Sequence, residues 1–116
     1  CLITDGMRPM LARGRRFTYL GLEYRVRNGA AWYNDGTLIG TATGQLDLLG
    51  RFARFAGVGR EDLLASATTT PARVLGLGKR KGRIAPGMDA DMILVDAGWR
   101  IETTWVGGRA VFERRR

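Results

Sequence analysis

The chain has 116 residues, 45% of them hydrophobic, and only 3 prolines, which suits one small ordered domain rather than a disordered segment. Its apolar runs are far shorter than the roughly 20 residues that a membrane-spanning helix needs. The formal net charge of +8, from 19 basic and 11 acidic residues, allows a polyanionic partner but does not establish one.

The sequence contains no histidine and one cysteine, Cys1. Catalytic zinc sites normally use imidazole ligands, and a Ser-His-Asp or Cys-His nucleophile needs an imidazole base. We therefore expect that the chain is not a self-contained enzyme of either kind. It begins at Cys1, directly in an apolar run, which indicates part of a longer protein. A single cysteine cannot form an internal disulfide and suits a reducing cytoplasm.

The first predicted element is a short buried strand over residues 1–4, followed by Asp5 and Gly6. Residues 7–16 contain a proline, a glycine and four arginines, which predicts a loop. No partner for the strand is recognisable in the rest of the chain. We therefore expect its neighbours to come from upstream sequence.

A β-hairpin is expected next. Apolar and charged residues alternate over residues 22–27, as in a half-buried strand. Asn28-Gly29 suits a type I′ turn, because both residues tolerate a positive φ, and residues 30–33 form the returning strand. A second turn over residues 34–36 and a small-residue loop over residues 37–43 follow.

Three helices are expected in the middle of the chain. Apolar residues recur at helical spacing over residues 45–56, and Gly57 ends the run. A short helix opens at Glu61, with acidic residues at its positive end. Thr70 is the predicted N-cap of a further helix over residues 71–75, with proline at its first position.

The last part of the chain is expected to be β-structure. Four consecutive apolar residues over 92–95 predict a buried strand. Residues 100–106 and 109–113, joined by Gly107-Gly108, predict a closing hairpin. The whole order of elements is a mixed α/β pattern.

Four segments occur in an order that resembles the C-terminal third of the amidohydrolase superfamily. They are Ile3-Thr4-Asp5-Gly6-Met7, Asp35 to Thr41 (DGTLIGT), Ala67-Thr68 with Pro71 to Leu77 (PARVLGL), and Lys81 to Asp91 (KGRIAPGMDAD). The last is similar to a segment found across the superfamily. The second, with the hairpin before it, is similar to the family of N-acetylglucosamine-6-phosphate deacetylases.

The resemblance implies an α/β fold, the C-terminal part of a (β/α)8 TIM-like barrel of a metal-dependent hydrolase, plus part of a composite β-sandwich. Residues 1–78 would hold the last barrel strand, the hairpin insertion and the C-terminal barrel helices. Residues 79–116 would be the sandwich segment. The full-length enzyme is expected to be cytoplasmic, with no membrane partner, and to be a homo-oligomer.

The resemblance also implies an activity. Asp5 would be the catalytic acid–base residue, taking a proton from metal-bound water and delivering one to the departing amine. Leu38, Ile39 and Gly40 would bind the substrate, and the products would be acetate and glucosamine-6-phosphate. The divalent metal, zinc by analogy, would be held by upstream residues that this chain lacks. Thr41 stands where the family commonly has serine, which keeps the hydroxyl.

Other interpretations stay open. The parent enzyme could be another amidohydrolase, such as a dihydroorotase-like or deaminase-like member. A different class is a small basic nucleic-acid-binding module, since ten of the 19 basic residues form three clusters: Arg13, Arg15 and Arg16; Lys79, Arg80, Lys81 and Arg83; Arg114 to Arg116. Their position in turns and at a terminus argues against groove binding. Asp89 and Asp91, without histidine, are expected to be structural, capping turns and pairing with nearby basic residues.

Overall fold

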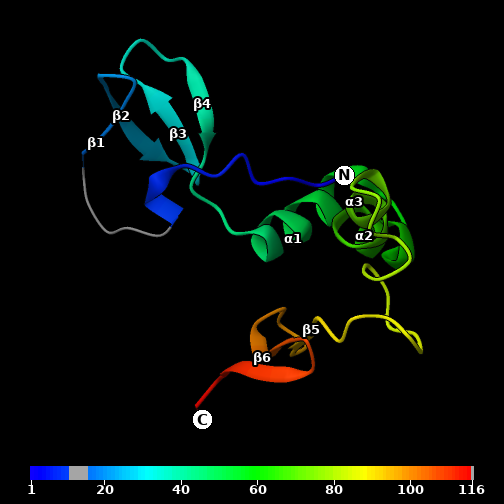
Figure 1. Ribbon diagram of the computed structural model, residues 1–116. Coiled ribbons are helices and arrows are strands. Elements are labelled where there is room, and N and C mark those ends of the chain that lie inside the picture. Colours follow the sequence, from blue (N-terminus) through cyan, green and yellow to red (C-terminus); the bar gives the residue numbers. More distant parts are fainter. Residues whose placement is uncertain (11–15, 116) are drawn as a thin grey trace. The chain divides into compact units, whose positions relative to one another are not determined.

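The computed structural model of this protein describes residues 1–10 and 16–115. It contains two compact units, Leu2–Arg51 and Phe52–Arg116, the second of which includes Cys1. Figure 1 gives the elements of both units along the chain. Within the described ranges, no helix combines the length and apolar character needed to cross a lipid bilayer.

The first unit is built on a four-stranded antiparallel sheet in the order β1-β2-β3-β4 (Figure 1). Its strands are Phe17–Tyr19, Leu22–Arg27, Ala30–Tyr33 and Leu38–Thr41. The predicted hairpin is confirmed as β2 and β3. Asn28 has φ 55° and Gly29 has φ 75°, so both turn residues adopt the positive values that a type I′ turn requires.

Two strands of this sheet were not predicted. β1 pairs with β2 through a turn in which Leu20 has φ 51° and Gly21 has φ 79°. The ring of Phe17 stacks on that of Tyr24, the largest fully buried side chain among the described residues. The predicted loop over residues 37–43 is wrong for Leu38–Thr41, which forms β4 against β3. The sequence of this strand lacks an apolar alternation, because it ends in Gly40-Thr41. Its pairing with β3 depends on backbone groups, which every residue has.

The prediction of a buried strand over residues 1–4 is wrong. These residues form no strand, and Ile3 is 72% exposed. The chain does supply one partner, because Gly6 forms a parallel bridge to Thr41. A strand needs neighbours along its length, and in the described ranges this segment meets one only at its end. The 3₁₀ helix η1, Arg8–Met10, follows, and residues 11–15 of the predicted loop lie outside the described ranges.

The helix α1, Gln45–Ala56, has the predicted bounds. Leu49 on its apolar face is buried, and Gly57 ends it with φ 59°. The segment before α1 is attached to the β2–β3 turn: the amide of Ala42 and the hydroxyl of the buried Thr43 both donate to the carbonyl of Gly29, at 2.9 and 2.8 Å. These bonds join the start of α1 to the sheet.

The second unit contains the helices α2, Arg60–Ala67, and α3, Thr69–Val74. They pack on each other, and Leu63 and Ala72 are buried. The predicted N-cap at Thr70 is wrong: the N-cap residue is Thr68, whose hydroxyl accepts no capping hydrogen bond from α3 and instead donates to the carbonyl of Leu64. Pro71 is still tolerated in the first turn, where a helix amide lacks an intrahelical acceptor.

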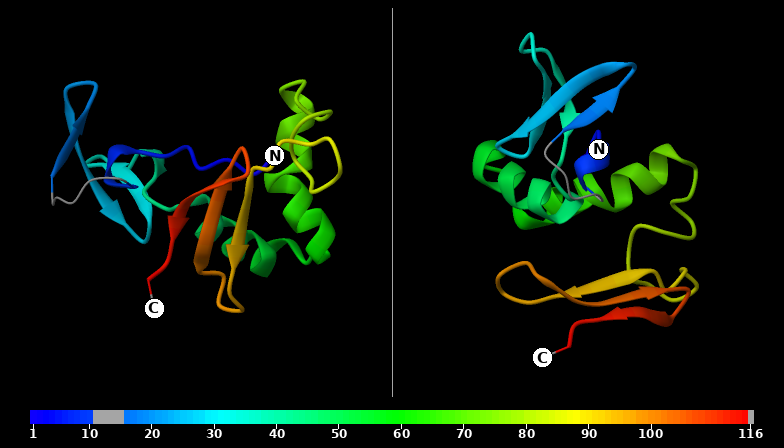
Figure 2. Two further views of the ribbon diagram at one scale, coloured as in Figure 1. Left: turned by 60° about the horizontal axis from the view of Figure 1, so that its bottom comes forward. Right: turned by 90° about the vertical axis from the view of Figure 1, so that its left-hand side faces the viewer.

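The C-terminal strands β5, Met92–Val95, β6, Ile101–Val106, and β7, Arg109–Glu113, form a three-stranded antiparallel sheet. Figure 2 shows them as neighbouring arrows coloured from yellow to red. The predicted strand and hairpin are confirmed, but the prediction that residues 92–95 are buried is wrong, since Ile93 is 50% and Leu94 49% exposed. A run of four apolar residues predicts a strand, but it does not show whether other elements cover the faces of the sheet.

The α/β class is therefore confirmed, in the form of two antiparallel sheets and three α-helices within residues 1–10 and 16–115. These residues do not form a barrel. The only parallel pairing among them is the bridge between Gly6 and Thr41.

Candidate active site

Asp5 lies at the end of the extended N-terminal segment and is exposed. Its φ of 46° is in the left-handed region, which few residues other than glycine adopt but which aspartate tolerates better than most. Its carbonyl oxygen accepts a hydrogen bond from the amide of Thr41 at 2.9 Å. The backbone at the predicted acid is thus held by a residue of β4.

Thr41 makes two further hydrogen bonds to this segment. Its hydroxyl donates to the carbonyl of Thr4 at 2.7 Å, and its carbonyl accepts from the amide of Met7 at 2.7 Å. Sequence reasoning noted only that Thr41 keeps a hydroxyl common to related proteins. Its contacts depend on two segments that are far apart in the sequence, so no local pattern pointed to them.

Gly40 is buried against the same segment, with φ 139°. A Cβ atom at this position would lie 2.5 Å from the carbonyl oxygen of Asp5, 2.9 Å from Cγ of Met7 and 3.4 Å from Oδ2 of Asp5. Only glycine allows β4 to approach the acid this closely. The structure therefore brings Asp5 and Gly40, two of the predicted site residues, into contact.

Leu38 and Ile39 are placed differently. Gly40 pairs with Ala31 and Leu38 pairs with Trp32, so Ile39 is the extra residue of a β-bulge. Ala31 and Trp32 are consecutive in β3 and face opposite sides of the sheet, and their partners do the same. Leu38, 57% exposed, is thus on the opposite face from Gly40, while Ile39 is half-buried.

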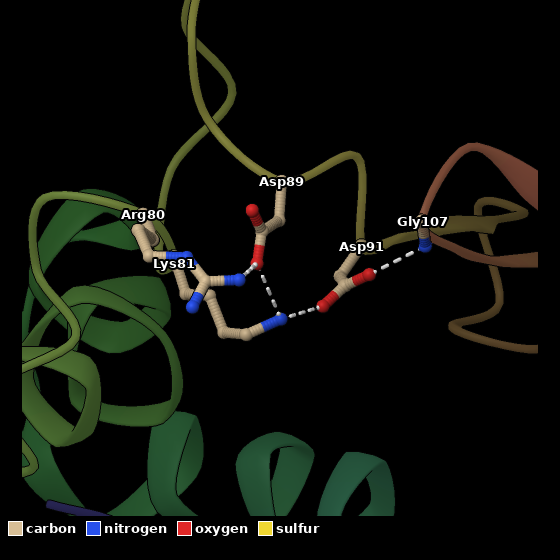
Figure 3. A network of polar contacts seen from close by, with 5 residues as sticks. All are labelled: Arg80, Lys81, Asp89, Asp91 and Gly107. Carbon is tan, nitrogen blue, oxygen red and sulfur yellow. Dashed lines mark hydrogen bonds and ion pairs between the residues drawn. The ribbon is translucent and has the colours of Figure 1, made fainter.

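The paired acids Asp89 and Asp91 belong to a polar network in the second unit (Figure 3). Oδ2 of Asp89 lies 2.9 Å from Nη2 of Arg80 and 3.0 Å from Nζ of Lys81. Lys81 also pairs with Oδ2 of Asp91. Oδ1 of Asp91 accepts from the amide of Gly107 at 2.7 Å, in the β6–β7 turn. The network joins the basic turn after α3 to the turn of the C-terminal hairpin.

The electrostatics of this network fit a structural role. The hydrogen bond from Lys81 lowers the pKa of Asp89, with Arg80 acting in the same direction. Lys81 and the amide of Gly107 lower the pKa of Asp91. Asp91 and Asp89 in turn raise the pKa of Lys81. All three groups stay charged at neutral pH, and each carboxylate has cationic partners.

The described residues do not fit a catalytic divalent metal. Such a site takes three or more protein ligands, usually including histidine. The chain contains no histidine. In the ranges 1–10 and 16–115 no three Cys, Asp or Glu side chains gather as a ligand set. Gly40 and Thr41, which contact Asp5, supply no second carboxylate. The described residues by themselves thus provide no complete metal site.

Comparison with known proteins connects this arrangement to one group of enzymes. The chain is 31% identical over 112 residues to N-acetylglucosamine-6-phosphate deacetylase of Vibrio furnissii, and 32% identical over 114 residues to that of Bos taurus. Each alignment covers 97% of the chain but only 28% of the relative. The chain thus spans little more than a quarter of the length of these relatives.

Solved structures agree with the fold. The deacetylase of Pasteurella multocida superposes with a TM-score of 0.88 at 24% identity, over 95% of this chain and 29% of that one. The deacetylase of Thermotoga maritima gives a TM-score of 0.85 at 28% identity, over 97% of this chain and 31% of that one. The model of the amidohydrolase family matches residues 8–111, nearly the whole chain. The chain therefore belongs to the amidohydrolase family.

Proposed function

We propose that this chain is the C-terminal part of a metal-dependent amidohydrolase that hydrolyses the acetamide of N-acetylglucosamine-6-phosphate to glucosamine-6-phosphate and acetate. One observation carries the proposal: Asp5 and Gly40 are in contact in a chain whose relatives are deacetylases of this sugar phosphate. In this assignment Asp5 is the catalytic acid–base residue, and Leu38, Ile39 and Gly40 contact the substrate.

Amide hydrolysis needs a group that first accepts a proton and then donates one. Water must lose a proton as its oxygen attacks the acetamide carbonyl, and the nitrogen must gain one as its bond to carbon breaks. A single carboxylate performs both steps when it reaches the water and the nitrogen. Asp5 is exposed, so its side chain is accessible, and its backbone is held by Thr41.

The remaining machinery is assigned to residues outside this chain. They would hold the divalent metal, for which zinc is proposed, and bind the sugar phosphate. Residues 1–78 would complete the barrel and residues 79–116 the β-sandwich, in a homo-oligomeric enzyme. Because the described residues lack a metal ligand set, no step of the proposal depends on a metal held by this chain.

The test is acetate release by the full-length protein, prepared with zinc and supplied with N-acetylglucosamine-6-phosphate. Asp5→Asn should lower kcat by about 10²- to 10⁴-fold, the range for losing a general acid–base group. Asp47→Asn, the same change at another exposed acid of the first unit, should stay within about twofold of wild type, as a surface substitution does. Turnover unaltered by Asp5→Asn would remove Asp5 from the mechanism.

A second sugar needs the same assay. The chain is also 27% identical over 108 residues to N-acetylgalactosamine-6-phosphate deacetylase of Escherichia coli O157:H7, and covers 29% of it. Both sugar phosphates should therefore be compared by kcat/KM. If neither releases acetate from a folded, metal-loaded protein, the substrate lies in another branch of the family.

The basic-module alternative receives less support from the structure. In the described ranges Arg80 and Lys81 pair with acids, and Arg114 lies 3.5 Å from Asp96. Arg13, Arg15 and Arg116 lie outside the described ranges. Nucleic-acid binding that weakens with added salt would be the observation in its favour.

A further inference from the structure

The two backbone dihedrals of Asp5 are both restrained by one residue, Thr41. The carbonyl of Thr4 belongs to the peptide plane whose rotation about the N–Cα bond of Asp5 is φ. This carbonyl accepts from the Thr41 hydroxyl at 2.7 Å. The carbonyl of Asp5 belongs to the plane whose rotation is ψ, and it accepts from the Thr41 amide at 2.9 Å.

A third contact closes the arrangement beyond Asp5. The amide of Met7 donates to the carbonyl of Thr41 at 2.7 Å, and Gly6 bridges to Thr41 in parallel register. Thr41 thus holds the chain before, at and after the acid. We call these contacts between Thr41 and Thr4, Asp5 and Met7 the Thr41 clasp.

The hydrogen bonds of the Thr41 clasp offset the free-energy cost of the backbone conformation of Asp5. Asp5 has φ 46°, and an L-residue in the left-handed region persists only when its surroundings enforce it. The direction of the Cα–Cβ bond follows from φ and ψ, so releasing the clasp would re-aim the carboxylate. Threonine suits this role because its branched Cβ restricts χ1 and keeps the hydroxyl in place.

We infer that Thr41 is a positioning residue for the Asp5 carboxylate, acting through the backbone of residues 4–7 without contacting substrate. The inference rests on the proposed role of Asp5 in acetamide hydrolysis. Under this inference, hydrogen bonds couple β4 to Asp5. Leu38 to Gly40 would contact the substrate, and the next residue, Thr41, would orient the carboxylate that transfers the proton.

Three variants of the full-length protein test it. Thr41→Val removes the hydroxyl at nearly constant shape, and Thr41→Ser keeps the hydroxyl. Thr43→Val is the matched control: Thr43 is buried and its hydroxyl donates to the carbonyl of Gly29 at 2.8 Å, away from residues 4–7. It makes the same chemical change two positions further along the chain.

The kinetic expectation separates positioning from general stability. Thr41→Val should lower kcat by roughly 10- to 100-fold, the loss expected when a reacting group is misplaced by about 1 Å. KM should stay within about twofold, because binding energy common to ground and transition states is retained. Thr41→Ser should restore most of kcat, and Thr43→Val should leave kcat within about twofold.

A double mutant shows whether Thr41 acts through Asp5. Combined with Asp5→Asn, Thr41→Val should cause little further loss, because residues that act as a unit are not additive. A Thr41→Val loss that persists in the Asp5→Asn background, or that Thr43→Val reproduces, overturns the inference. So does a Thr41→Val enzyme with wild-type kcat.

Amide hydrogen exchange tests the clasp without using turnover. Thr41→Val should speed exchange of the Met7 and Thr41 amides by about tenfold, since each donates within the clasp and local opening sets their protection. Thr43→Val should not change these two rates. If the wild-type protein releases no acetate, the proposed reaction fails, and the exchange rates alone decide whether the clasp exists; unchanged rates overturn it.

Discussion

Replacing Gly40 with alanine is the sharpest test of how closely β4 approaches Asp5. The added Cβ would lie 2.5 Å from the carbonyl oxygen of Asp5 and 2.9 Å from Cγ of Met7. The first of these is a backbone atom, so no side-chain rotation relieves the contact. The backbone of Gly40, with φ 139°, is also one that an L-residue rarely adopts.

The magnitude follows from these two costs. Overpacking a close contact costs about 1–3 kcal/mol. Holding an alanine in a sparsely populated backbone region costs about 1–3 kcal/mol more. We therefore expect Gly40→Ala to lower the free energy of unfolding by about 3–4 kcal/mol, near the middle of the summed range.

Gly36→Ala provides the control. Gly36 has φ 91°, but a Cβ there would meet no atom within 4 Å. Gly36→Ala should therefore lower the free energy of unfolding only by the cost of the backbone conformation, about 1–2 kcal/mol. The assay is urea unfolding of the full-length protein followed by tryptophan fluorescence, with wild type and both variants compared at equal m-value. If Gly40→Ala is no more destabilising than Gly36→Ala, the close approach of β4 to Asp5 is refuted.

Two further predictions concern the turns and the polar network. Asn28→Ala should lower the free energy of unfolding by about 1 kcal/mol, because Asn28 has φ 55° and alanine lacks its tolerance for that region; Asn28→Gly, compared in the same urea titration, should not. The pKa of Asp91 is lowered by Lys81, so Asp91 stabilises the fold above its ordinary pKa of 3.8, and this contribution is lost as the pH falls through the lowered folded-state value. Asp91→Asn should therefore flatten the acid limb of a plot of Tm against pH, and an unchanged limb would show that the pair does not contribute.

Local structure was largely predictable from sequence. Asn28-Gly29 specifies a type I′ turn, and the structure has positive φ at both residues. The helix α1 follows from apolar periodicity that ends at Gly57. Such features depend on interactions between residues close in the chain, so their signal survives in the sequence alone.

The candidate site was predictable only in part. Asp5 and Gly40 were singled out because of a resemblance, and the sequence could not show that they touch. Thr41 was overlooked as a structural residue, although it makes three hydrogen bonds to the segment around Asp5. The bulge that places Leu38 and Gly40 on opposite faces of the sheet was equally hidden, because it depends on the register of β3 against β4.

From the sequence alone came the Asn28-Gly29 turn, the three α-helices, the β2–β3 and β6–β7 hairpins and the family resemblance, because these follow from local backbone preferences and short motifs. The folded chain was needed to show that Leu38–Thr41 forms β4 and that residues 1–4 form no strand. The same holds for Ile93 and Leu94, which remain about half exposed. The physical reason is common to all three: backbone pairing and burial depend on what lies opposite a segment, and distant parts of a chain come together only when it folds.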